Sequence, residues 1–303
     1  VLFEYPIQSE QANFSINPTL ARLGLRTVTV LRFVLPNDTI RAFEYHGNPG
    51  LVRLDPRWHQ AALRFVNLGF EHILDGIDHL LFLACLVIPF RRVRPLIAII
   101  TSFTVAHSVT LIASAFDFAP DALWFPPLVE TAIAMSIVYM ALENVFGVRL
   151  QRRWLLTFGF GLVHGFGFSF ALRETLQFAG GHLLTSLLAF NLGVELGQLL
   201  VIILLVPLLS LLFRVTAAER AGTILLSVLV AHTAWHWMSE RGSELIQYQF
   251  QFGLPVFDLA FLASAMRWGM LVLIVILLLW LMSLVFPSLD ESTKPVPADV
   301  KQD

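Results

Sequence analysis

Charged side chains are scarce in this sequence and cysteine is nearly absent. Asp, Glu, Lys and Arg together make up 14% of the 303 residues, whereas soluble globular domains carry roughly 25%. The net charge of -2 gives no strong attraction to nucleic acid. The single cysteine, Cys85, excludes a disulfide framework and a thiolate metal cluster within one chain. Any metal site would therefore have to use histidine and carboxylate ligands.

Long apolar runs take the place of the missing charge. Hydrophobic residues reach 56%, and the mean hydropathy is +0.72. A membrane-spanning helix needs about 20 mostly apolar residues. Seven stretches are read as spans: 68–90, 96–116, 127–146, 154–172, 183–213, 221–239 and 267–286. The sequence therefore predicts an all-α polytopic membrane protein with about seven transmembrane helices in a bundle, surrounded by the lipid bilayer.

The distribution of arginine orients these spans. Arginines gather after the first, third and fifth predicted spans, for example at Arg91, Arg152 and Arg214. Basic loops remain on the cytoplasmic side of a membrane. We therefore expect a bacterial inner-membrane protein whose N-terminus is outside, in the periplasm, and whose C-terminus is inside.

The chain is expected to have three parts. These are an outer β-rich segment, a seven-helix transmembrane domain and a disordered cytoplasmic tail, at residues 1–62, 63–286 and 287–303. Within the outer segment, 27–35 and 39–45 are rich in β-formers and flank a Pro36-Asn37-Asp38 turn, which predicts a hairpin. This segment also offers a surface for a protein partner.

Ionisable and polar residues recur inside the predicted spans, where each charged group costs about 2.5–3.5 kcal/mol on insertion scales. Six histidines lie in or at the edge of spans: His72, His79, His107, His164, His232 and His236. With Asp78 they are the candidate metal ligands, because the predicted orientation places all of them in the outer half of the bilayer. The candidates for outer-shell or pathway roles are Glu130, Asn191, Glu195 and Gln198.

Helical spacing supports a shared site. His72 and His79 are seven residues apart and so lie on one helical face, while His232 and His236 are four apart, a spacing at which two imidazoles bind one metal. Imidazole with carboxylate suits a divalent transition metal such as Ni, Co or Zn rather than Ca or Mg. A buried hydrogen-bond network without metal is the alternative.

Several motifs resemble the HupE/UreJ family of membrane proteins, in its longer subfamily with an extra outer domain. The first is His72-Ile-Leu-Asp75-Gly76-Ile-Asp78-His79. Further matches are Phe103-Thr-Val-Ala-His107-Ser-Val-Thr110, Val129-Glu130, Ala134-Met-Ser136-Ile137, Phe160-Gly-Leu-Val-His164-Gly-Phe-Gly167 and Phe190-Asn191-Leu-Gly-Val-Glu195-Leu-Gly-Gln198. The resemblance covers about residues 65–240.

The resemblance implies a nickel or cobalt permease. It carries His72, Asp78 and His79 over as metal-binding residues, with Glu130 and Glu195 as further candidates. Two other functions stay open. A zinc-dependent intramembrane hydrolase would use three histidines and an open position to activate water, with a carboxylate as base. A non-catalytic metal sensor or assembly subunit would use the outer segment as its partner surface. Catalytic residues and oligomeric state are not predicted.

Overall fold

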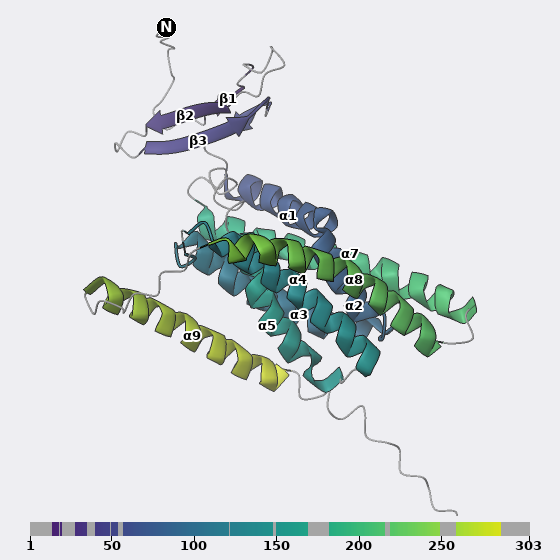
Figure 1. Ribbon diagram of the computed structural model, residues 1–303. Coiled ribbons are helices and arrows are strands. Elements are labelled where there is room, and N and C mark those ends of the chain that lie inside the picture. The colour runs from purple at the N-terminus through teal and green to yellow at the C-terminus, as the bar shows by residue number, and fades with distance from the viewer. Residues whose placement is uncertain are drawn as a thin grey trace, which may run out of the picture.

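Helices dominate the protein (Figure 1). The computed structural model describes residues 14–17, 19, 28–34, 40–48, 50–53, 57–120, 122–147, 150–168, 182–215, 219–248 and 259–285. The helices are α1 (Trp58–Asp75), α2 (Ile77–Val87), α3 (Val93–Ala115), α4 (Phe125–Phe146), α5 (Leu150–Gly167), α7 (Leu183–Val215), α8 (Glu219–Ile246) and α9 (Leu259–Val285). The predicted tail 287–303 lies outside the described residues.

The predicted spans coincide with helices, and the first is divided between α1 and α2. Four described helical stretches are long and apolar enough to cross a membrane: Val93–Ala115, Phe125–Phe146, Leu183–Arg214 and Ala265–Leu284. The helices α5 and α8 carry arginine or histidine inside their apolar stretches, which lowers their hydropathy. The protein is therefore a multi-pass membrane protein, and the count of seven spans stays a prediction.

The break in the first predicted span falls at Gly76. This residue has an extended backbone conformation, with φ of -77° and ψ of 98°. Its amide N–H donates to the carbonyl of His72 at 3.1 Å and closes the last turn of α1, while its own carbonyl accepts from Leu80 in α2. A Cβ at this position would lie 2.7 Å from Nδ1 of His79. A glycine is therefore needed where the two helices meet.

Glycines bring two helix pairs close together. Gly69 of α1 and Gly193 of α7 each lie against backbone of the opposite helix, so that an added Cβ would overlap a carbonyl oxygen. Gly161 and Gly165 of α5 lie in the same way against α3. Small residues four apart allow such close approach of helices in membranes. The close packing of α1 with α7, and of α3 with α5, places their polar side chains next to one another.

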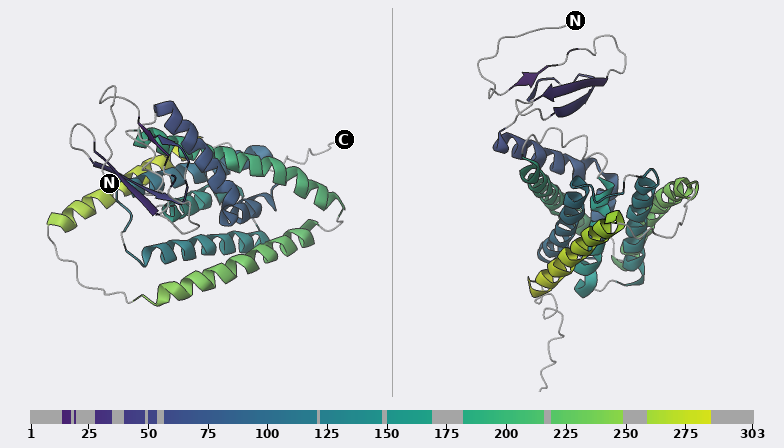
Figure 2. Two further views of the ribbon diagram at one scale, coloured as in Figure 1. Left: turned by 90° about the horizontal axis from the view of Figure 1, so that it is seen from above. Right: turned by 90° about the vertical axis from the view of Figure 1, so that its left-hand side faces the viewer.

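The apolar core joins most of these helices and includes Phe65, Ile73 and Phe103, all essentially inaccessible to solvent. The helix α4 packs beside α8. Figure 2 shows α8 at the outer edge of the bundle and α9 on a different side, close to α3 and α5. Among the described residues, nothing packs on the face of α8 that points away from α4.

The outer segment contains short strands that lie beyond α1 at one end of the bundle (Figure 1). The two predicted β-rich runs form β2 (Val28–Val34) and β3 (Ile40–His46), which pair antiparallel as expected for a hairpin. A further two-residue pair joins β1 (Ser15–Ile16) to β4 (Val52–Arg53). The extra outer domain that the family resemblance implies stays a prediction.

Candidate metal centre

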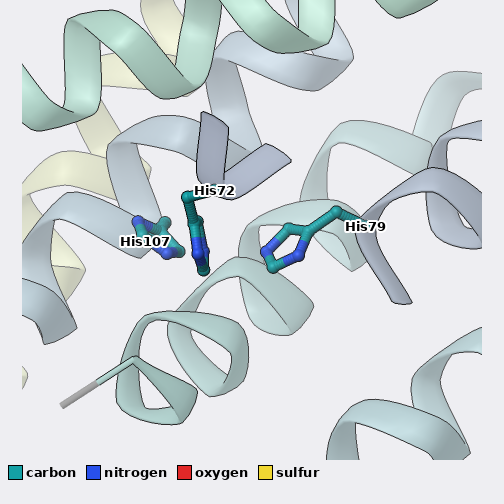
Figure 3. Close-up of side chains that lie close together, drawn as sticks. All are labelled: His72, His79 and His107. Carbon is teal, nitrogen blue, oxygen red and sulfur yellow. The ribbon is translucent and has the colours of Figure 1, made fainter. Parts of the chain in front are cut away.

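Four histidines from four helices meet inside the bundle. They are His72 of α1, His79 of α2, His107 of α3 and His164 of α5. The ring centroids of His72 and His79 are 4.7 Å apart, those of His79 and His164 are 5.4 Å apart, and those of His72 and His107 are 6.2 Å apart. Figure 3 shows the first three converging from separate helices. The sequence predicted that these four would share one layer, and the fold brings them into contact.

The cluster provides two overlapping sets of ligands. One set is His72, His79 and His107, and the other is Asp78, His79 and His164. Within each set the ligand atoms lie within 4.8 Å of one another, which a bound transition metal could bridge after small side-chain adjustments. His79 belongs to both sets. It is only 5% exposed, and His107 and His164 are more deeply buried still.

Asp78 fixes the tautomer of His79. Nδ1 of His79 lies 3.0 Å from the carboxylate Oδ1 of Asp78. A carboxylate accepts hydrogen bonds, so the proton is placed on Nδ1, and Nε2 keeps its lone pair. A carboxylate in this position also orients the ring and raises its basicity as a ligand.

Asn191 of α7 does the same for His107. The Asn191 amide donates through Nδ2 to the carbonyl of Leu187 at 2.8 Å. This leaves Oδ1 as the acceptor for Nδ1–H of His107, at 3.2 Å. The lone pair of His107 is therefore on Nε2. Asn191 was predicted for an outer-shell or pathway role, and in the structure it contacts His107.

Ser136 of α4 holds the fourth histidine. Its hydroxyl donates to the carbonyl of Ile133 at 2.7 Å and lies 3.1 Å from Nε2 of His164. Because the hydroxyl proton is already used, the oxygen accepts from Nε2–H, and the lone pair of His164 is on Nδ1. Sequence reasoning did not select Ser136 as a site residue. Its place in the Ala134-Met-Ser136 motif was the available signal.

Four buried ring nitrogens have no hydrogen-bond partner among the described residues, and the three on His79, His107 and His164 are the ones left with lone pairs. These buried atoms are Nε2 of His72, His79 and His107 and Nδ1 of His164. An unsatisfied buried polar atom costs about 1–3 kcal/mol, so several in one place require an explanation. A metal ion bound by either ligand set would accept the lone pairs of the histidines in that set. The donor set, with its carboxylate and amide outer partners, fits a transition metal.

A row of polar contacts continues from His107 along the interface of α3 and α7. Thr104 donates to the side-chain oxygen of Gln198 at 3.0 Å, and Thr101 donates to Oε1 of Glu195 at 2.6 Å. The second carboxylate oxygen of Glu195 is buried without a partner in the described part of the chain. Thr104 and Thr101 precede His107 by about one and two helical turns. The row therefore leads away from the histidines toward the N-terminal end of α3.

An acidic cavity lies on the other side of the cluster. Its volume is about 380 Å³. Its charged lining residues are Asp75, Asp78, Glu130, Glu240 and Arg241. Glu130 pairs with Arg241 across α4 and α8 at 3.1 Å, and both side chains are exposed by more than 40%. Glu130 thus lies in this cavity, while Asp78 joins the cavity to His79.

His232 and His236 lie elsewhere. Both are on the exposed face of α8, with ring centroids 4.6 Å apart. Within the described residues, neither belongs to a ligand set or ring contact that includes the four buried histidines. The predicted pair is therefore formed, but it is separate from the buried cluster.

A buried charge network closes the opposite end of the bundle. The fully buried guanidinium of Arg153 donates to Glu143 at 3.3 Å and to the side chain of Asn144 at 2.5 Å. The same guanidinium reaches the carbonyls of Cys85 and Leu86 in the last turn of α2. These hydrogen bonds hold α2 against α4 and α5, and Glu143 serves as the counter-ion of Arg153.

One family model matches most of this chain. Its description is HupE / UreJ protein, and it covers residues 51–241. The matched stretch contains all four buried histidines and the exposed pair. No curated protein and no solved structure matches the chain.

Proposed function

This chain belongs to the HupE/UreJ family of membrane proteins, and from this we propose that it is an inner-membrane permease for Ni²⁺ or Co²⁺. The family is associated with nickel and cobalt transport. The observation that carries the proposal is the group of four buried ring nitrogens without hydrogen-bond partners among the described residues. In this proposal the ion is cargo. Imidazole nitrogen suits these two metals better than it suits Mg²⁺ or Ca²⁺.

The acidic cavity is the proposed entrance from the periplasm. Four of its lining side chains are carboxylates and one is an arginine, so its field concentrates cations. Asp78 lines the cavity and also accepts the hydrogen bond from His79. An ion attracted by the carboxylates therefore reaches the outer ligand set, Asp78, His79 and His164, without crossing an apolar layer.

The polar row between α3 and α7 is the proposed exit. His79 belongs to both ligand sets. An ion can therefore pass from the set that contains Asp78 to the set that contains His107 while it stays bound to His79. Beyond His107, the free carboxylate oxygen of Glu195 is the next buried acceptor. A permease needs polar groups at successive depths, and these groups supply them.

Uptake of radioactive Ni²⁺ into proteoliposomes tests the proposal. His79→Ala should abolish uptake, because it removes the ligand shared by both sets. Glu195→Gln should leave equilibrium binding of Ni²⁺ nearly unchanged and should lower the rate of uptake. His59→Ala, at an exposed residue of α1, is the matched control and should behave like the unaltered protein. Full uptake by His79→Ala would refute the proposed central site.

A zinc-dependent hydrolase is the second candidate, favoured by the three-histidine set beside the carboxylate Asp78. A resident zinc ion would survive dialysis at near one per chain, whereas cargo would exchange. Zinc that is retained through dialysis, together with no uptake of Ni²⁺ into proteoliposomes, would favour the enzyme. In that case Glu195→Gln should have little effect on the amount of zinc retained, since Glu195 is not in either ligand set.

A further inference from the structure

We propose that His232 and His236 are half of a second transition-metal site, which the same pair from a second copy of this chain completes. Their rings lie 4.6 Å apart on the exposed face of α8. Histidines four apart on a helix bind a single metal ion. A tetrahedral site needs four ligands, and the described residues of the same chain add none to this pair.

The exposed face of α8 has the pattern of a helix–helix interface. Its outward residues recur at alternating spacings of three and four: Leu225, Val228, His232, Trp235 and Ser239. This is the spacing of the contact positions in a two-helix coiled coil. Leu225, Val228 and Trp235 are each about half exposed or more, whereas Ser227 and Ala234 are buried on the opposite side, toward α4. The face is therefore patterned for another helix.

The position of this face points to a copy of the same helix. Figure 2 shows α8 at an outer edge of the bundle, where a second molecule can reach it. Two copies inserted in one membrane with the same orientation are related by a twofold axis along the membrane normal. Their α8 helices then run parallel, and each contact position meets its own counterpart.

This symmetry supplies the missing ligands. His232 lies at the middle of α8 and at a contact position, so it faces His232 of the second copy, with His236 one turn further along in each. Four imidazoles then surround one point on the axis. In the seven-span arrangement the alternative is two imidazoles facing lipid, which is unfavourable. The inference does not depend on transport, because it uses none of the buried histidines.

Native mass spectrometry of the full chain in mild detergent, with and without added Zn²⁺, tests the proposal. Zn²⁺ should convert monomer to dimer and add one zinc ion per dimer beyond those bound in the two buried clusters. The double variant His232→Ala/His236→Ala should lose this dimer. His59→Ala, which removes a different exposed histidine, should keep it. His79→Ala should also keep it, and this separates the proposed site from the buried cluster.

Cysteine cross-linking tests the geometry with both histidines in place. Val228→Cys, at a contact position, should form a disulfide-linked dimer more readily when Zn²⁺ is present. Leu208→Cys, on the exposed face of α7, should not, and the native Cys85 is buried. A monomer under all conditions, a dimer indifferent to Zn²⁺ and to the double substitution, or no cross-link at Val228→Cys would overturn the proposal.

Discussion

Replacing Asn191 with leucine should weaken metal binding without removing any metal ligand. The amide of Asn191 accepts from Nδ1–H of His107 at 3.2 Å and is itself held by the Leu187 carbonyl. Leucine has a similar volume and provides no acceptor, so the buried Nδ1–H loses its partner at a cost of about 1–3 kcal/mol. Loss of such outer-shell partners typically lowers metal affinity by about 10- to 100-fold, or about 1.4–2.8 kcal/mol.

The measurement is competition between the purified protein and a chelator for Ni²⁺, with Asn191→Leu compared with Gln198→Leu. Gln198 lies on the same face of α7 and loses a similar hydrogen bond, to Thr104, but no hydrogen bond joins it to a histidine in the described structure. Its variant should lose less than about tenfold in affinity. Equal losses in the two variants would mean that a general disturbance of α7 is responsible. An unchanged affinity in Asn191→Leu would refute the assigned tautomer of His107.

Three further outcomes are expected. Gly193→Ala should destabilise the protein by about 1–3 kcal/mol, because the added methyl overlaps a carbonyl of α1. The measurement is the melting temperature in detergent, which should fall. Gly159→Ala, which has open space around it, is the control and should leave the melting temperature unchanged. Arg153→Met should lower the free energy of unfolding by about 3–5 kcal/mol, since it removes the cation that pairs with the partly buried Glu143 and bonds to Asn144. Glu143→Gln leaves the fully buried guanidinium of Arg153 without its counter-ion and should lower it by a comparable amount in the same melting measurement. Saturating Ni²⁺ at 100 times its dissociation constant should stabilise the protein by about 2.7 kcal/mol, and His79→Ala should remove that shift; an equal shift in both proteins would place the ion elsewhere.

The sequence predicted the positions of the helices well, because the length of an apolar run is directly limited by membrane thickness. It did not predict the break at Gly76. A glycine inside a helical pattern is compatible with a continuous helix, and only the extended conformation of this residue separates α1 from α2.

The sequence predicted how deep in the membrane the histidines lie, but it did not predict toward which side of its helix each one points. Depth alone grouped His232 with His79, but the rotation of α8 about its axis turns His232 outward. Ser136 was missed because a serine in a helix usually bonds its own backbone, which it does here while also contacting His164. A serine hydroxyl can make both contacts only when a suitable side chain of a neighbouring helix lies next to it, which the sequence alone does not show.

Because Gly76 separates α1 from α2, the distance between His72 and His79 depends on how these two helices are placed. His72 belongs to α1, which packs on α7, whereas His79 belongs to α2, which packs mainly on α4 and also on α7. An ion held by both rings would therefore join two parts of the bundle, α1 on α7 and α2 on α4, across the break at Gly76. Transporters with interrupted helices open to alternate sides by rocking such parts against each other. In this protein the occupancy of the site and the angle between α1 and α2 would change together.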